Sequence, residues 1–164
     1  MIGNPAVTGI SDPRLDGFQF LTEVTIDGAV AAWNTVATHE VFTVTGTVKY
    51  KVLYVVTADL TSSGSAEIAF GREGATDSVS SAQAFSGLDA GEIVIPGGTN
   101  AAISASATHG ANTTAGRGAD YVSGLDLGYE VTTAALTGGT IKAYCWWTPI
   151  TGDGLVSAGT GAAL

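Results

Sequence analysis

The chain has 164 residues, with 15 acidic and 6 basic side chains, so its formal net charge at pH 7 is −9. Hydrophobic residues make up 45% of the sequence, which excludes wholesale disorder. Six scattered cations exclude the phosphate-neutralising surface of a nucleic-acid binder and the polybasic patch of a membrane-surface protein.

Charged residues are only 13% of the chain, against about 25% in a typical soluble domain. This deficit has two interpretations: a surface rich in Thr, Ser and Gly, or a surface covered by further copies of the chain. No apolar run reaches the length of a membrane-spanning helix, and residues 1–20 lack the pattern of a secretory signal. Cys145 is the only cysteine, so we expect a protein made in a reducing cytoplasm or carried in a particle assembled there.

The N-terminal part of the chain predicts an arm followed by a strand. Residues 1–17 contain Pro5 and Pro13 and are expected to be extended. Apolar side chains then recur at alternate positions from Phe18 to Ile26, as on one face of a strand. Residues 29–34 fit either a short strand or one helical turn.

Two longer strands are predicted next, at 36–45 and 47–59. In the second, Val and Tyr alternate on one face, while the other face begins with lysines and ends with Leu53 and Val55. The solvent face of a one-sided antiparallel sheet is normally polar. We therefore expect a loop or a neighbouring subunit to cover Leu53 and Val55.

The middle of the chain predicts short strands joined by loops. Residues 99–119 are rich in Ala, Ser, Thr, Gly and Asn, which indicates a long loop. A long loop in a small domain is typically functional, mobile or part of an interface. The short strands are expected at 66–70, 78–84 and 92–95, with a loop at 71–77.

The C-terminal part predicts a hairpin. Two strands, at 127–136 and 140–150, are expected to be joined by a turn at Gly138-Gly139. Residues 155–164 are small and unpatterned, and are expected to form a flexible tail or a docking segment.

Many short strands with almost no helical periodicity predict an all-β protein, a single β-sandwich of the jelly-roll or Greek-key kind. The expected organisation is an extended N-terminal arm at 1–17, a sandwich domain at 18–154 and a flexible C-terminal tail at 155–164.

The residue types and motifs that usually carry out catalysis in enzymes are rare in this sequence. His39 and His109 are the only histidines, and no G-x-S-x-G motif marks a nucleophile, so we expect each histidine to lie on a strand surface or in a loop. The carboxylates do not match a calcium loop, and the Gly-rich pieces match no nucleotide-binding loop. We expect no enzyme activity, no cofactor and no metal.

The final predicted strand is rich in aromatic residues. Tyr144 and Trp146 share one face with Lys142, while Cys145 lies on the opposite, apolar face and is expected to act as a small hydrophobic residue. Three interpretations of Tyr144 and Trp146 remain open. They pack under a loop, form a subunit interface, where aromatic residues are enriched, or form a platform on which a sugar stacks.

Two segments carry a resemblance to a known family. Residues 36–48 (VATHEVFTVTGTV), running on to 57–61 (TADLT), form the first. Residues 138–150 (GGTIKAYCWWTPI), followed by 152–154 (GDG), form the second. Both resemble the small all-β virion proteins of tailed bacteriophages, which include capsid decoration (cement) proteins and head fibres, whereas residues 71–120 depart from that pattern.

The resemblance implies a homotrimer that sits on the capsid lattice at three-fold positions and clamps neighbouring capsomers. The expected function is thus that of a decoration protein, located on the virion surface and assembled in the host cytoplasm. Its partners would be further copies of itself and the major capsid protein, with no nucleic acid and no membrane.

Two groups of residues are expected to carry this function. The capsid-docking arm would use Pro5, Ile10, Pro13 and Leu15, and the subunit interface would use Leu53, Val55, Tyr144 and Trp146. The alternative is a receptor- or glycan-binding module of a tail or head fibre, which requires a solvent-exposed Trp33 or Trp146. An enzyme would require His39 or His109 close to two carboxylates.

Overall fold

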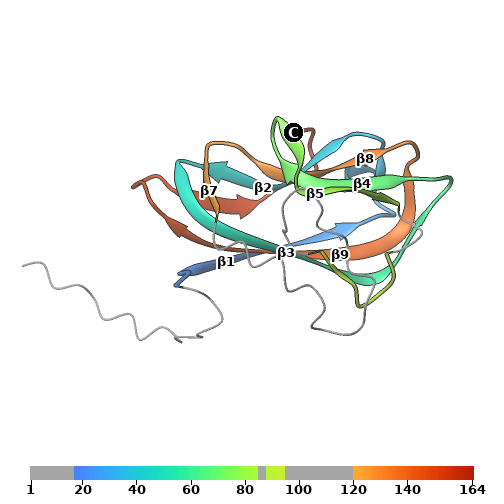
Figure 1. The fold of residues 1–164 in the computed structure, drawn as a ribbon, viewed down its shortest axis with the longest axis horizontal. Helices are drawn as coiled ribbons and strands as arrows, with labels where there is room; N and C mark the ends of the chain where they lie inside the picture. Colours follow the sequence, from blue (N-terminus) through green and yellow to red (C-terminus); the bar gives the residue numbers. More distant parts are fainter. Residues whose placement is uncertain (1–16, 85–87, 95–119) are drawn as a thin grey trace, which may run out of the picture.

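The computed structural model describes residues 17–84, 88–94 and 120–164. Two antiparallel sheets pack face to face, and Figure 1 shows them as a lower and an upper layer. This confirms the prediction of an all-β sandwich. The expected arm residues Pro5, Ile10, Pro13 and Leu15, His109 and the loop expected at 99–119 lie outside the described residues.

Sheet A is the lower layer in Figure 1 and has the strand order β1-β9-β3-β6, with β7 also paired to β3. The strands β6 and β7 pair with different parts of β3, the first near Tyr54 and the second near Val48. The bounds are β1 Phe20–Asp27, β3 Thr47–Ser62, β6 Ile93–Val94, β7 Asp120–Ser123 and β9 Leu136–Pro149.

Sheet B is the upper layer and has the strand order β10-β2-β8-β4-β5. Its bounds are β2 Thr38–Thr45, β4 Glu67–Arg72, β5 Ala75–Ala84, β8 Leu127–Thr132 and β10 Leu155–Ala158. Residues 29–34, which fitted either a strand or a helical turn, contain the one-turn helix α1 at Ala31–Asn34. None of the helices in the described parts of the chain is long and apolar enough to cross a membrane.

The core lies between the two sheets and follows from alternation along the strands. The Val and Tyr residues of β3 that share one face are all buried, as the sequence predicted. They meet aromatic side chains of sheet B, and the ring centroids of Tyr54 and Phe70 lie 4.2 Å apart. Removing an apolar side chain of this size from water stabilises the fold by about 1.5–3 kcal/mol. The inner faces therefore supply the fold with its core.

The prediction that Gly138-Gly139 forms the turn of a hairpin is wrong. The strands β8 and β9 belong to different sheets, and β9 begins at Leu136, before the two glycines. The register between β9 and β3 shifts beside these glycines, which marks a bulge. Gly139 has a φ of +95°, and a Cβ there would lie 2.5 Å from the carbonyl oxygen of Asp59. The glycines thus permit a close approach within a long strand and do not form a turn.

The prediction of a flexible tail at 155–164 is also wrong for the residues that form β10. Residues 155–158 pair with β2, and Val156 is buried. Beyond the strand, the Gly159 amide donates to the Val41 carbonyl, and the Glu40 amide donates to the Ala162 carbonyl. Backbone pairing with β2 orders this segment, although its side chains give no strand pattern. The sandwich domain therefore extends past its expected end at 154.

The loop expected at 71–77 is shorter than predicted. The strand β4 continues to Arg72 and β5 begins at Ala75, so a tight turn at Glu73-Gly74 joins the two strands. Gly74 has a positive φ of 73°, which the turn needs and which glycine adopts without strain.

Candidate interaction surface

The outward-facing side of sheet A carries apolar and aromatic side chains where a solvent face is expected to be polar. Trp146 on β9 lies opposite Leu21 on β1 and Lys51 on β3. Tyr144, two residues before Trp146, lies opposite Glu23 and Leu53. We call this side the outer face of sheet A; its central residues are Leu21, Glu23, Lys49, Lys51, Leu53, Val55, Lys142, Tyr144 and Trp146.

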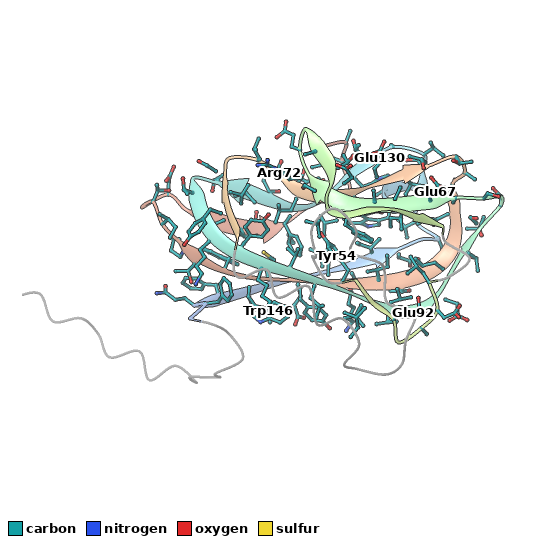
Figure 2. All side chains as sticks on the ribbon, in the orientation of Figure 1. Tyr54, Glu67, Arg72, Glu92, Glu130 and Trp146 are labelled. Atoms are coloured by element: carbon teal, nitrogen blue, oxygen red, sulfur yellow. The ribbon has the colours of Figure 1, made fainter. Side chains whose placement is uncertain are left out.

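The aromatic pair lies at the centre of this face. The rings of Tyr144 and Trp146 have centroids 5.9 Å apart and an interplanar angle of 21°. Figure 2 shows Trp146 on the side of the lower layer that points away from sheet B. Both side chains are half-buried, while Leu21 is 47% exposed. At the far edge of β3, Tyr121 lies opposite Lys49 and is 64% exposed.

The cations of the described residues are concentrated on the same face. Lys49, Lys51 and Lys142 all occupy its register positions, and the fourth cation of the described residues, Arg72, lies on sheet B. The ammonium of Lys49 lies 4.9 Å from the ring centroid of Phe18. Glu23 is the one carboxylate among the outward positions 21–25, 49–55 and 142–148. This face therefore holds three of the four Lys and Arg side chains among the described residues of a chain whose net charge is −9.

The outer side of sheet B has the opposite character. Glu40, Glu67 and Glu130 occupy outward positions on β2, β4 and β8, and none of the strands of this sheet contains a lysine. Figure 2 shows Glu67 and Glu130 on the upper layer, on the far side of the molecule from Trp146. The Thr76 hydroxyl donates a 2.6 Å hydrogen bond to Glu130, and the Thr43 hydroxyl donates to Glu40.

The structure brings the four predicted interface residues together. Leu53 and Val55 on β3 and Tyr144 and Trp146 on β9 lie on one face of two paired strands. Sequence reasoning missed Leu21 as a member of this face. Its signal was present, because Leu21 lies an odd number of residues from Val24 and Ile26, the buried positions of the first strand, and so points to the other face.

His39 is a buried residue, and the expectation that it lies on a strand surface is wrong. Its side chain is 2% exposed and stacks on the ring of Tyr129, with 5.0 Å between ring centroids. The Nδ1 atom lies 3.0 Å from the carbonyl oxygen of Ala32 and 3.3 Å from that of Gly161, while Nε2 lies 2.9 Å from that of Thr35. His39 thus joins α1 and the C-terminal segment to β2, which is a structural role.

Other potentially reactive side chains, a cysteine and two tyrosines, are buried in the core. Burial raises the pKa of the Cys145 thiol to about 12, so this thiol is protonated at neutral pH. Burial also raises the pKa values of the Tyr54 and Tyr129 hydroxyls far above their usual range. Within residues 17–84, 88–94 and 120–164, no group of three or more His, Cys, Asp or Glu side chains is placed to hold a metal ion.

Comparisons with protein-family models, with curated proteins and with solved structures gave no match to this chain.

Proposed function

We propose that this protein is a structural protein that acts by adhesion, as a bacteriophage capsid decoration protein. In this proposal it forms a homo-oligomer, a trimer on the virion surface, and binds the assembled shell of the major capsid protein. The outer face of sheet A provides the subunit contact, and the arm at 1–17 provides the contact with the shell.

The observation that carries the proposal is the composition of the outer face of sheet A. The inner faces of the two sheets already supply a buried core, so packing among residues 17–84, 88–94 and 120–164 gives no reason for Leu21, Leu53 and Trp146 to lie side by side in outward positions. Aromatic side chains are enriched in protein interfaces because they bury large areas with few rotatable bonds. The face therefore has the chemistry of a contact surface.

A decoration protein needs no reaction chemistry, since binding is the function. A protein that binds the assembled shell and not the free subunits shifts the equilibrium toward the shell by mass action. Repeated weak contacts on one lattice give avidity without a single tight site. Two of the described titratable groups have structural surroundings, since the ring nitrogens of His39 face backbone carbonyls and Cys145 lies in the core.

The experiment is cosedimentation of the purified protein with particles of the encoding phage from which the native copy has been stripped. We expect saturable binding and a higher temperature of shell disruption. Deleting residues 1–17 is expected to abolish binding and to leave the oligomer intact, because the arm and the outer face of sheet A have separate roles. Failure of the full-length protein to bind stripped shells would contradict the proposal.

A second candidate function is favoured by the geometry of the aromatic pair. Tyr144 and Trp146 present two neighbouring rings beside Lys142 on a sheet surface, an arrangement on which a sugar ring could stack. The other tryptophan named for this function, Trp33, is half-buried against the core. For a glycan-binding module, Trp146→Ala would lower attachment to host cells and leave the thermal stability of the virion unchanged.

A further inference from the structure

We infer that protonation of His39 controls how firmly α1 and the C-terminal segment, residues 159–164, are held against the sandwich. This conformational device goes beyond the proposed function, since it does not depend on what the protein binds. The juxtaposition that carries it is a buried imidazole ring whose two nitrogens both face backbone carbonyl oxygens.

The contacts of the ring match the imidazolium form. The carbonyl oxygens of Ala32 and Gly161 lie 3.0 Å and 3.3 Å from Nδ1 of His39, and that of Thr35 lies 2.9 Å from Nε2. A carbonyl oxygen only accepts hydrogen bonds, so each ring nitrogen needs a proton of its own. Imidazolium carries a proton on both nitrogens, whereas neutral imidazole carries a proton on one. In the neutral ring, the lone pair of the other nitrogen would therefore point at an oxygen atom.

The surroundings of the ring also suit a positive charge. Burial of a charged group is unfavourable unless hydrogen bonds replace those that it made to water. Both N–H groups of the imidazolium donate to carbonyls in this geometry, and hydrogen bonds from a charged donor are stronger than those from a neutral one. The ring also stacks on Tyr129, with 5.0 Å between centroids, and an aromatic face attracts a cation at this distance. These contacts stabilise the charged ring in place of water.

The elements around the ring contain few other titratable groups. The helix α1 and residues 159–164 have no titratable side chain. The hydroxyl of Tyr129 donates to a backbone carbonyl of α1, and burial raises its pKa, so it stays neutral. Glu40 on β2 and Glu130 on β8 each directly follow one ring of the stacked pair, so alternation points them to the outer side of sheet B, where threonine hydroxyls donate to them. Within these described elements, the ring protons of His39 therefore face carbonyl groups and not a carboxylate.

The charged ring fastens two pieces of the chain to β2. Ala32 belongs to α1 and Thr35 directly follows it, while Gly161 belongs to the C-terminal segment. The two pieces also pack on each other, because a Cβ at Gly161 would lie 2.4 Å from the Ala32 carbonyl oxygen. Loss of a proton from either ring nitrogen therefore loosens both pieces as the pH rises. Since the Glu40 amide donates to the Ala162 carbonyl, loosening the segment also frees backbone groups at the edge of β2, where another strand could pair.

One titration followed by nuclear magnetic resonance tests both parts of the inference, because the shifts of the ring nitrogens report which of them carries a proton. His109 is the only other histidine, so His109→Gln identifies the signals of His39 and is the matched control. The pH is raised until His39 loses a proton, while exchange of the Gly159 and Gly161 amides, which donate to carbonyls of β2, is measured. Corrected for hydroxide catalysis, this exchange should become about tenfold faster or more, as expected for losing a hydrogen bond to a charged group. Amides of β9, which lies between β1 and β3, should not change.

A second variant, His39→Gln, removes the titrating group, so exchange of the same two amides should depend on pH through hydroxide catalysis alone. A His39 ring that is already neutral at about pH 5, where a solvated histidine is charged, would overturn the inference. Unchanged exchange of the Gly159 and Gly161 amides when the ring loses its proton would overturn it as well. If His39→Gln does not fold, the titration of the His109→Gln protein decides between these outcomes.

Discussion

A single hydroxyl in the core offers a sharp test of the packing. Tyr54 on β3 is 0% exposed, and its hydroxyl has no hydrogen-bond partner in the described structure. Figure 2 places this side chain between the two layers. Because burial raises the pKa of Tyr54, the hydroxyl is neutral at every pH at which the protein is handled. The free-energy cost of burying the Tyr54 hydroxyl is therefore that of a neutral, desolvated polar group without a hydrogen-bond partner.

The magnitude follows from this environment. A buried hydroxyl without a partner costs about 1–3 kcal/mol, and phenylalanine keeps the ring that packs on Phe70. We expect Tyr54→Phe to raise the free energy of unfolding by about 1 kcal/mol. For a chain of this size, that corresponds to an increase in Tm of about 2–4 °C.

Tyr129→Phe is the matched control, because it makes the same chemical change in the same aromatic cluster. The Tyr129 hydroxyl donates a hydrogen bond to the backbone carbonyl of Trp33. Its removal leaves that carbonyl without this donor, so we expect a loss of about 1 kcal/mol. The two substitutions should therefore move stability in opposite directions.

Urea unfolding of both variants and the wild type gives the comparison, at one protein concentration because the proposed self-association would contribute to stability. If Tyr54→Phe loses as much stability as Tyr129→Phe, the Tyr54 hydroxyl has a partner and the reasoning is refuted.

Three further predictions concern the C-terminal segment and the core. Deleting residues 159–164 removes backbone hydrogen bonds to β2 and should cost about 2–4 kcal/mol in urea unfolding, whereas a flexible tail would cost nothing. Gly128→Ala should cost about 3 kcal/mol or more, since its Cβ would lie 2.0 Å from the His39 carbonyl oxygen and 2.6 Å from the Leu164 side chain; an unchanged midpoint would contradict this packing. Because burial raises the pKa of Cys145 from 9.0 to about 12, the folded protein should resist a thiol reagent at pH 8. Rapid labelling of the folded protein would refute the burial of this thiol. The neutral thiol also contributes stability that is present below pH 9.0 and should be lost as the pH rises toward 12.

The parts of the fold that the sequence predicted correctly are those with one buried face. Along β3, alternate Val and Tyr residues face the core, so the period of two was visible without the structure. The outward positions of the same strand gave Leu53 and Val55, and those of β9 gave Tyr144 and Trp146. Alternation assigns residues to a face, which is why these four were found together.

The errors arose where long-range pairing overrides local pattern. Gly138-Gly139 resembles a turn in the sequence. Pairing with β3, a strand distant in sequence, instead produces a bulge at these glycines and determines their conformation. Residues 155–158 have small side chains and gain order from backbone pairing with β2. His39 is buried because α1 and the C-terminal segment surround its ring, and neither contact can be read from its neighbours in sequence.

The central proposal is that the outer face of sheet A holds copies of the protein together. The direct measurement is the molar mass of the wild type and of Trp146→Ala by light scattering over a range of concentrations. We predict a wild-type oligomer, with three copies as the expected number, and a variant that is folded but largely monomeric. A wild-type monomer throughout the range, or a variant with unchanged mass, would contradict the claim.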